Sequence, residues 1–567
     1  MAPIGEPALE PPLRAGEVHP CDPDLLEPQV HALAFDVGGQ PSETGEGKLG
    51  DGGGGGAHVT PKYNRAMSAL PEAIYTAEQV RTLDRIAIDE LGIPGYELMS
   101  RAGAAALQAL RCRWPDARAL TICCGAGNNA GDGYVLARLA SEGGLRARVI
   151  ALVAPERLTG DAARAWEDYR AGGGRVETPP PLPALAGDVV VDALLGTGLD
   201  RELEGTFADA VGAINACGRP VLALDVPTGL HADTGLPLGF AVRADLTVTF
   251  VGLKQGLFLG AASDYRGQLE FCGLGLPAEA HERMAAPMRR LTRATLEGAL
   301  PPRRRSAHKG AHGSVLLIGG APGMAGAIRL AGEAALRAGA GLVRVATHPD
   351  SVAHVMAGRA EVMCEGVSGP AGLASLIEVS DGIVLGPGLG GSEWARALWA
   401  AALDADRPLV LDADGLNLLA ARPRGRNRWL LTPHPGEAAR LLGSSAAAVQ
   451  TDRLGAVTAL AERYQAVALL KGAGSLVAEP GGGPVSVCDR GNPGMGTAGM
   501  GDVLAGVLGA LVVQGGADLG LAARAGVLLH ALAGDDAAAA GERGLLAGDL
   551  LPHVRRRANP GGQEPRA

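Results

Sequence analysis

The sequence predicts an α/β protein with two mostly parallel sheets, each packed between layers of helices. Short β-rich apolar runs alternate with helical stretches in two separate series along the chain. Strands that alternate with helices form right-handed βαβ units, whose strands are parallel neighbours. The chain of 567 residues is also too long for a single hydrophobic core, which stops growing at about 250–300 residues. We therefore expect two three-layer α/β domains.

We predict four parts in the chain. Residues 1–70 contain a run of five glycines and few large apolar groups, so they cannot bury enough surface to offset the entropy of ordering and should form a disordered leader. The first domain is expected at 71–280 and the second at 300–557, separated by a stretch rich in Pro, Arg and Ala. Residues 558–567 form a polar tail.

The first domain opens with a helix signal. Val80, Leu83 and Ile86 recur at near-helical spacing. Thr76 is a suitable N-cap, with Gln79 three residues later. The strands that follow are expected at 119–124, 146–154, 188–195, 220–226 and 244–252. The strands of the second domain are expected at 313–319, 341–347, 381–386, 408–412, 428–432 and 467–471.

Charge and composition exclude several classes of protein. The formal net charge of −10 argues against a nucleic-acid-binding protein, which normally carries a basic surface. The short run Arg303–Arg305 is accordingly interpreted as part of a solvated linker. The eight cysteines form no C-x-x-C pair and no zinc-ligand spacing, so we expect reduced thiols in a cytoplasmic protein. No apolar run approaches the length of a membrane span, about 18 residues, and no secretory signal is visible.

A glycine-rich segment, GAGNNAGDG, joins the first expected strand to a helix at residues 125–133. Glycines let the backbone approach a phosphate and the helix N-terminus supplies free N–H donors, which predicts a Rossmann-like dinucleotide site. The G-x-G-x-x-A part alone fits an NAD dehydrogenase equally well. Asn128, Asn129 and Asp132 are more specific, because two amides and a carboxylate in one loop can hold a ribose, an amide and a cation together. The structural alternative is a tight turn that uses Asn and Gly for positive φ.

Two further strand ends of the first domain carry carboxylates. Asp192 lies in the strand expected at 188–195, which leads into the sequence GTGL. Asp225 lies near the end of the strand expected at 220–226 and precedes the sequence VPTG. A buried carboxylate needs a partner, and ligands of parallel sheets bind at the carboxyl ends of the strands. The three motifs together predict one binding site, although each aspartate could by itself cap a turn.

These segments resemble the NAD(P)H-hydrate epimerases over roughly residues 75–275, through YTAEQVRTLD, GIPGYELMSRAG, GAGNNAGDG, DALLGTGL and LDVPTGL. The resemblance implies K⁺ bound by Asn129, Asp192 and Thr228, whose oxygens suit a hard cation. It also makes Asp225 the candidate for proton transfer at the epimerised carbon. Family members usually have Gly at the position of Ala130, and often Ser at that of Thr228. The residues implied to contact the hydrate are Asn128, Asn129, Ala130, Gly131, Asp132, Gly196, Thr197, Gly198, Leu199, Asp200, Arg201, Glu202 and Asp225.

The second domain has motifs rich in glycine after several expected strands. They are GGAPGMAGA at 319–327, GPGLG at 386–390, LTPHPGE at 431–437, KGAGS at 471–475 and GMGTAGMGD at 494–502. No G-x-x-x-x-G-K-[ST] P-loop is present in the chain. A phosphate site in this domain must therefore be built from other loops.

The motif at 494–502 is the most informative of these. Gly499 and Gly501 open onto an apolar helix, so the backbone N–H groups at the helix start can form an anion hole. The carboxylate of Asp502, in the first turn, could take a proton from a hydroxyl while those N–H groups hold the phosphoryl group under attack. Phosphoryl transfer needs this combination of positioning, charge stabilisation and a base. The alternative is a helix start with a favourably placed acidic residue.

Residues 305–555 resemble the ribokinase-like fold, and within it the ADP-dependent NAD(P)H-hydrate dehydratases, through TPHPGE, KGAG and GNPGMGTAGMGD. The resemblance implies that Mg²⁺ accompanies the phosphates of ADP. It also implies that Asp502 deprotonates the C6 hydroxyl of the hydrate, which attacks the β-phosphate, and that the phosphate ester then eliminates. The implied hydrate contacts are Ala327, Gly388, His434 and Asp502. The implied nucleotide contacts are Lys471, Gly472, Ala473, Gly474, Ser475 and Gly501.

The two resemblances together imply nicotinamide nucleotide repair. An isomerase domain would interconvert the R and S forms of NADHX and NADPHX, and a lyase domain would dehydrate the S form at the expense of ADP, giving AMP and phosphate. We expect a homo-oligomer with no nucleic-acid or membrane partner. One rival is a small-metabolite kinase of the ribokinase-like class fused to a Rossmann-type dehydrogenase. The other is a dinucleotide sensor without catalysis.

Overall fold

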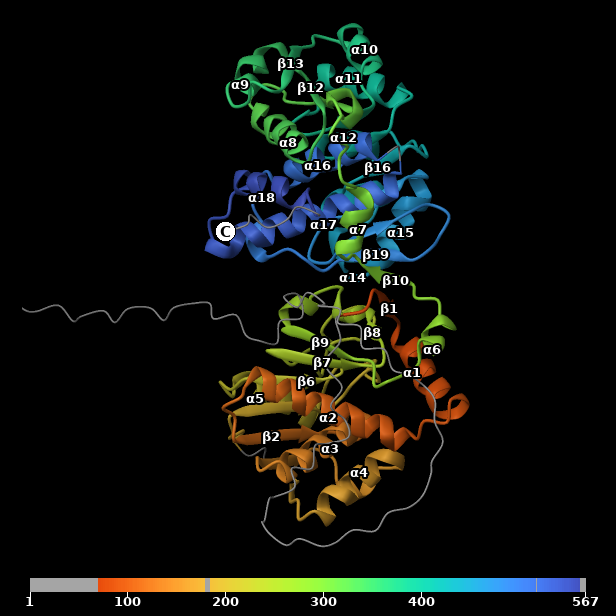
Figure 1. The fold of residues 1–567 in the computed structure, drawn as a ribbon, viewed down its shortest axis with the longest axis vertical. Coiled ribbons are helices and arrows are strands. Elements are labelled where there is room, and N and C mark those ends of the chain that lie inside the picture. The colour runs from red at the N-terminus through yellow and green to blue at the C-terminus, as the bar shows by residue number, and fades with distance from the viewer. Residues whose placement is uncertain (1–69, 179–183, 516–517, 561–567) are drawn as a thin grey trace, which may run out of the picture.

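The computed structural model describes residues 70–178, 184–515 and 518–560. The leader expected at 1–70 lies outside these residues except for Leu70, and so does most of the tail expected at 558–567. The described chain forms two α/β bodies stacked along the long axis of the molecule, the first mainly orange and yellow and the second mainly green and blue (Figure 1). In the described ranges, no helix combines the length and the apolar character that a membrane crossing requires.

The first body contains a seven-stranded sheet in the order β4-β3-β2-β5-β6-β7-β9, with every neighbouring pair parallel. All five strands expected in this domain are confirmed, whereas β4 and β9 were not expected. Because β3 and β5 lie on opposite sides of β2, the chain order reverses there, and such a reversal opens a crevice at the carboxyl ends of the strands. The strands are β2 (Ala119–Cys124), β3 (Arg146–Ala151), β4 (Val176–Glu177), β5 (Val189–Ala193), β6 (Val221–Leu224), β7 (Leu246–Phe250) and β9 (Gln268–Cys272).

Helices cover both faces of this sheet. One face packs against α2 (Gly95–Arg113), α3 (Asn128–Glu142) and α4 (Gly160–Ala171), and the other against α5 (Gly205–Ala216). Two shorter helices, α1 (Ala77–Arg85) and α6 (Ala278–Glu282), lie near the junction with the second body (Figure 1). The helix α1 begins as expected, because the Thr76 hydroxyl accepts from the Gln79 N–H and the Gln79 side chain accepts from the Thr76 N–H. This reciprocal pair confirms the capping box.

The second body is organised by a twelve-stranded sheet in the order β13-β12-β11-β14-β15-β16-β17-β18-β19-β10-β1-β8. The six expected strands of this domain are confirmed as β11, β12 and β14 to β17, all parallel to their neighbours in that part of the sheet. β18 pairs antiparallel with both β17 and β19. The strands from β11 to β19 are β11 (Ser314–Ile318), β12 (Leu342–Thr347), β13 (Met363–Gly366), β14 (Gly382–Leu385), β15 (Leu409–Leu411), β16 (Trp429–Leu431), β17 (Val467–Leu470), β18 (Ser475–Ala478) and β19 (Val485–Cys488).

Helices again cover both faces. The core on one face includes residues of α8 (Ala325–Arg337), α16 (Met500–Gln514), α17 (Leu519–Ala537) and α18 (Leu550–Arg557). The core on the other face includes residues of α10 (Pro370–Glu378), α11 (Glu393–Asp404), α12 (Ala413–Ala421), α13 (Pro435–Leu442), α14 (Ala446–Thr451) and α15 (Arg453–Tyr464). The remaining helices of this body are α7 (Arg293–Ala299) and α9 (Val352–Met356).

Three short strands at one edge join the two bodies. β10 (Met288–Arg290) pairs with β19, β1 (Ala73–Tyr75) pairs with β10, and β8 (Leu253–Lys254) pairs with β1. The strands β1 and β8 come from the range expected for the first domain, yet they extend the sheet of the second. Hydrogen bonds of one sheet therefore connect the two bodies. The domain limits expected at 280 and 300 stay predictions.

Candidate active sites

The glycine-rich motif of the first domain forms the start of α3. The helix begins at Asn128, after a turn of three residues that follows β2, so Asn128 to Asp132 occupy its first turns. Ala130 is fully buried. Gly133 allows close packing on the sheet, since a Cβ atom there would lie only 2.6 Å from the Cβ of Ala193 in β5. The side chain of Asn129 is also buried, and within the described chain neither its oxygen nor its nitrogen has a hydrogen-bond partner. A buried amide without partners is uncommon, which points to a bound group at this position.

Asp192 and Thr228 form a buried pair at the carboxyl ends of β5 and β6. The Thr228 hydroxyl donates to Asp192 Oδ1 at 2.7 Å, and the Thr228 N–H donates to Asp192 Oδ2 at 2.8 Å. Burial raises the pKa of Asp192 to about 6, while the hydrogen bonds from Thr228 lower it. Asn129 approaches the same end of the sheet from α3, beside Gly196. The structure thus brings Asp192 and Thr228 into direct contact, and it places Asn129 next to the loop that follows Asp192.

A buried ion pair, Lys254–Asp225, lies at the end of β6. The ammonium group of Lys254 is 1% exposed and donates to Asp225 Oδ1, to Thr249 Oγ1 at 3.0 Å and to the carbonyl oxygen of Phe250 at 2.7 Å. Asp225 has φ of +65°, a left-handed conformation that is costly for a residue other than glycine and is often found at functional sites. Its other oxygen, Oδ2, would lie 3.5 Å from a Cβ atom at Gly196. Asp225 therefore pairs with Lys254 through one oxygen and directs the other toward the predicted substrate loop.

Two more carboxyl groups belong to this cluster. Burial raises the pKa of Asp84, on α1, to about 6; Lys254 lowers it in part and Asp225 adds to the rise. The pKa of Asp132 is well above its ordinary value. Burial is the largest cause, and the negative charges of Asp225 and Asp84 raise the pKa further. The helix α1 lies over this region, because Arg81 donates to the carbonyl oxygen of Thr197 at 3.2 Å. Three carboxyl groups and one ammonium group thus interact in one cluster.

The loop from Gly196 to Glu202 extends from that cluster to the surface. Gly196 lies beside both Asn129 and Asp225, since a Cβ atom there would come within 3.5 Å of each side chain. Leu199 packs on the core beneath α5. The remaining predicted contacts of the loop, Gly198, Asp200, Arg201 and Glu202, are exposed. Only the first part of the loop is therefore in contact with the buried residues of the predicted site.

The second cluster is built at the carboxyl ends of β15, β16 and β17. Lys471 Nζ donates to Asp412 Oδ1 at 2.7 Å and lies 3.8 Å from Glu437 Oε2. Asp412 Oδ1 also accepts from the Thr432 hydroxyl at 2.7 Å. Burial alone would lower the pKa of Lys471, but Asp412 and Glu437 outweigh it and the pKa stands above its ordinary value. The site therefore holds a fixed ammonium group against two buried carboxylates.

Asp502 faces this cluster from the first turn of α16. Burial raises the pKa of Asp502 to about 6, with Asp412 adding to the rise and Lys471 opposing it. A Cβ atom at the preceding residue, Gly501, would lie 3.5 Å from Lys471 Nζ. Gly499, the N-cap, has φ of +89°, which favours glycine, and the first N–H groups of the helix have no partner within the helix itself. A carboxyl group with a raised pKa, beside N–H donors that have no partner within the helix, is suited to general-base chemistry.

The predicted hydrate contacts fall into two groups. Ala327, on α8, and Gly388, after β14, are neighbours, since a Cβ atom at Gly388 would lie 3.2 Å from the Cβ of Ala327. The His434 side chain caps α13 by accepting from the Gly436 N–H at 3.0 Å, and the backbone N–H of His434 donates to Glu437 Oε2 at 2.8 Å. His434 thus reaches the lysine cluster through Glu437. The structure shows no direct contact between this histidine and the Ala327–Gly388 pair.

The predicted nucleotide loop, residues 471–475, leads from β17 to β18. The Ser475 hydroxyl donates to the Gly472 carbonyl oxygen at 2.9 Å and closes the loop, while Ala473 at its tip is exposed. Gly474 has φ of +65°, and a Cβ atom there would lie 2.3 Å from the carbonyl oxygen of Phe258. Phe258 comes four residues after Lys254. The predicted nucleotide loop of the second domain therefore contacts a segment that also contributes Lys254 to the first cluster.

Sequence analysis did not identify four residues of these clusters, although signals were available for most of them. Lys254 follows an expected strand, and a lysine in such an apolar run is rarely buried without a partner. Asp412 ends the strand expected at 408–412, as Asp192 and Asp225 do near theirs. Glu437 stands three residues after His434, at capping-box spacing. Asp84 lies on an amphipathic helix, where an acidic residue carries no such signal.

Comparison with known proteins identifies the family. Two α/β domains, one with a glycine-rich turn between a strand and a helix and one with a carboxylate in the first turn of a helix, are typical of an enzyme with two sites for nucleotides. Residues 95–256 match the family described as YjeF-related protein N-terminus, and residues 315–556 match the family described as NAD(P)H-hydrate dehydratase. The chain belongs to the bifunctional NAD(P)H-hydrate repair enzymes, with an epimerase domain followed by a dehydratase domain.

Full-length relatives support this assignment. A bifunctional NAD(P)H-hydrate repair enzyme of Coxiella burnetii is 49% identical over 489 residues, covering 86% of this chain and 99% of the relative. The enzyme of that name from Escherichia coli is 43% identical, covering 87% and 95% respectively. Among solved structures, an ADP/ATP-dependent NAD(P)H-hydrate dehydratase from Bacillus subtilis, co-crystallised with ATP and Mg²⁺, matches 47% of this chain and 96% of its own at 28% identity, with a TM-score of 0.43.

Proposed function

We propose that the chain repairs hydrated nicotinamide dinucleotides through two separate sites that act in sequence. The first interconverts the R and S forms of NADHX and NADPHX. The second dehydrates the S form to NADH or NADPH and consumes ADP, which leaves as AMP and phosphate. The observation that carries the proposal is the position of Asp502 beside the Lys471–Asp412 pair and the N–H groups at the start of α16.

In the dehydratase site, Asp502 takes the proton of the C6 hydroxyl. The hydroxyl oxygen then bonds to the β-phosphorus of ADP, the bond from that phosphorus to the bridging oxygen breaks, and AMP departs. Loss of phosphate from C6, together with a proton from C5, restores the ring double bond. Lys471 and the N–H groups of α16 hold the phosphoryl group and offset its developing charge. Phosphate leaves more readily than hydroxide, which accounts for the use of a nucleotide.

The residues of this site fit Mg²⁺ and a nucleotide. Asp412 Oδ2 accepts no hydrogen bond within the described chain, and the side chain of Glu437 lies nearby. Mg²⁺ binds through one or two carboxylates together with the phosphates of a nucleotide, where it neutralises their charge. We assign the nucleotide contacts to Lys471–Ser475 and Gly501, and the hydrate contacts to Ala327, Gly388, His434 and Asp502.

In the epimerase site, Asp225 handles the proton at the epimerised carbon. Lys254 holds one of its oxygens, so the other is the oxygen available to substrate. We assign the hydrate contacts to Asn128–Asp132, Gly196–Glu202 and Asp225. The buried amide of Asn129, with no partner in the described chain, and the Asp192–Thr228 pair fit K⁺, which would supply a fixed positive charge to substrate oxygens. Within the described residues no group of three or more His, Cys, Asp and Glu side chains could hold a metal ion. The K⁺ proposed here would instead depend on one amide, one hydroxyl and one carboxylate.

The remaining assignments concern partners and location. We propose that the substrates are NADHX, NADPHX and ADP, that the enzyme is a homo-oligomer, and that it acts in the cytoplasm without nucleic-acid or membrane partners. The net charge of −10 argues against a nucleic-acid partner, and the family of the chain supports the substrates.

The test is to incubate the full chain with a mixture of R and S NADHX, add ADP, and follow the absorbance of NADH while AMP and phosphate are quantified. Both epimers should be converted, with one AMP and one phosphate for each NADH. Conversion that stops at the S fraction would exclude the epimerase activity. A requirement for ATP, with a phosphorylated metabolite as product, would favour the small-metabolite kinase, and binding without turnover would favour the sensor.

A further inference from the structure

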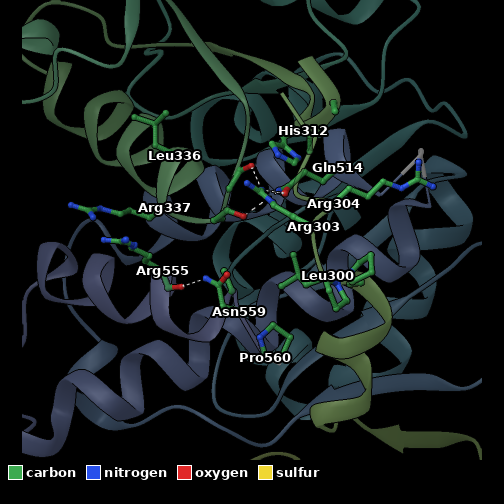
Figure 2. A pocket seen from close by; sticks show the side chains of 18 of the residues that line it. Leu300, Arg303, Arg304, His312, Leu336, Arg337, Gln514, Arg555, Asn559 and Pro560 are labelled. Carbon is green, nitrogen blue, oxygen red and sulfur yellow. Dashed lines mark hydrogen bonds between the residues drawn. The ribbon is translucent and has the colours of Figure 1, made fainter. Parts of the chain in front are cut away.

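Arg303 and Arg304, two residues of the arginine run, line a hollow that lies outside both sites. This hollow, of about 1090 Å³, is open to solvent and lies where α8 and α16 end, whereas Asp502 lies at the beginning of α16 (Figure 2). We call it the arginine basin. Its charged lining consists of five arginines and two glutamates: Arg303, Arg304, Arg337, Arg359, Arg555, Glu333 and Glu361.

The basin is basic although the protein is acidic. The chain as a whole carries a net charge of −10, yet arginines outnumber glutamates five to two in this lining. The positive charge of the basin also affects His312. Its pKa is lowered first by burial and then by the charges of Arg303 and His308. A concave surface with one dominant sign of charge concentrates ligands of the opposite sign.

Arg303 is fixed in place at the floor of the basin. Its guanidinium donates to the carbonyl oxygen of Gly339 and to Gln514 Oε1 at 2.7 Å (Figure 2). The approach requires glycine, because Gly339 has φ of +99° and a Cβ atom there would lie 2.4 Å from Arg303 Nη2. Gln514 in turn donates to the carbonyl oxygen of Ala338 at 3.1 Å. The carbonyl oxygens of Ala338 and Gly339, at the end of α8, would repel an anion if they were free. Both already accept hydrogen bonds, from Gln514 and Arg303 respectively.

The other guanidinium groups retain unused donors. Glu333 is shared between Arg359 and Arg337, the latter at 3.5 Å. Arg304 and Arg555 form no ion pair within the described part of the chain. Arg337 and Arg555 extend in the same direction from α8 and α18, two helices that pack against each other (Figure 2). Because, among the described residues, Arg337 shares its only carboxylate with Arg359 and Arg555 has none, this side of the basin carries a net positive charge.

We propose that the arginine basin binds a polyphosphate group, either free or carried by a nucleotide. The guanidinium fork matches pairs of phosphate oxygens, and several arginines around one hollow can hold more than one phosphate. The volume of about 1090 Å³ is slightly above that of typical small-ligand pockets, about 300–1,000 Å³. Leu300 and Pro560 supply an apolar part of the lining, which would suit a nucleotide base. The proposal does not depend on the chemistry of either active site.

The experiment is isothermal titration calorimetry of the full chain with inorganic tripolyphosphate, with ADP and AMP in parallel titrations. The test variant is Arg304→Ala with Arg555→Ala. Arg422→Ala, which removes an exposed arginine elsewhere in the same domain, is the matched control, and Lys471→Ala removes the cation of the active site. We expect a tripolyphosphate site that weakens at least tenfold in the double variant, is unchanged in the control, survives in Lys471→Ala, and weakens with salt.

Each outcome decides the proposal. Tighter binding of ADP than of tripolyphosphate at the site lost in the double variant would identify the nucleotide as the ligand, and the reverse would identify free polyphosphate. Binding lost in Lys471→Ala but kept in the double variant would place the anion in the active site and overturn the proposal, as would no binding by the parent protein. A changed oligomeric state of the double variant in light scattering, without loss of anion affinity, would show instead that the basin contacts a second copy of the chain.

Discussion

Asp502→Asn separates catalysis from helix capping at the start of α16. Asparagine keeps the size of the side chain and can still accept a hydrogen bond, but it cannot take a proton from the C6 hydroxyl. Loss of a general base lowers the rate by about 10²–10⁴, which corresponds to about 3–5 kcal/mol of activation free energy. We therefore expect ADP-dependent recovery of NADH from the S hydrate to fall at least a hundredfold.

Although Asp502→Asn should lower the rate, it should not lower the stability of the protein. Burial raises the pKa of Asp502 from 3.8 to about 6, so the folded protein holds this proton more tightly than the unfolded chain. The ionised group then destabilises the fold above pH 6, by an amount on the order of 3 kcal/mol, and this cost disappears as the pH falls below 3.8. Loss of the helix-dipole interaction costs only about 0.3–1 kcal/mol. At neutral pH the variant should be at least as stable as the parent.

The assay compares NADH recovery, ADP affinity and melting temperature in the parent, in Asp502→Asn and in a control. Asp518→Asn is the control, because Asp518 caps α17 through the Leu521 N–H at 2.8 Å and therefore also places a carboxylate at a helix start. The parent rate should fall as the pH is lowered through about 6, where Asp502 becomes protonated. Turnover of Asp502→Asn within a few-fold of the parent, or a lower melting temperature with an unchanged pH profile, would refute the assignment of the base.

Three further substitutions test the other assignments. Asp192→Asn should weaken epimerisation and its dependence on K⁺ while dehydration of the pure S hydrate continues; equal loss of both activities would contradict a local role. Lys254→Gln should reduce epimerisation at least a hundredfold and cost about 3–5 kcal/mol of stability, measured by denaturant unfolding, because it leaves a carboxylate without its buried partner. Gly474→Ala should weaken ADP binding at least tenfold, since its Cβ atom would lie 2.3 Å from the Phe258 oxygen, whereas Gly481→Ala, at a similar φ but with open space around it, should not.

Much of the fold could be predicted because its central strands are buried on both faces. Such strands appear as continuous apolar runs between glycine-rich turns, and all eleven expected strands are present in the structure. The positions of Asp192 and Asp225 followed from a single rule, that ligands bind at the carboxyl ends of parallel strands. The rule identifies which residues of the chain lie at strand ends. It also predicts that these residues meet at the carboxyl edge of the sheet.

The pairing of side chains within each site was less accessible to sequence analysis. Lys254 approaches Asp225 from a strand of two residues, and Asp84 approaches the same cluster from a helix about 140 positions earlier in the chain. Asp412 carried the same strand-end signal as Asp192, but the ion pair with Lys471 spans 59 positions. Contacts of this kind depend on how distant elements pack, and local patterns contain no information about that packing.

The junction of the two bodies shows why this matters for function. The strands β1 and β8 have three and two residues, too few for an alternating pattern, and yet they continue the sheet of the second domain into the first. The segment that begins with β8 contributes a contact to each of the two clusters. Lys254 holds Asp225 in the epimerase site, and four residues later the carbonyl group of Phe258 supports Gly474 in the nucleotide loop of the dehydratase site. A change that displaces this segment must therefore alter both sites, although no substrate contact is shared between them.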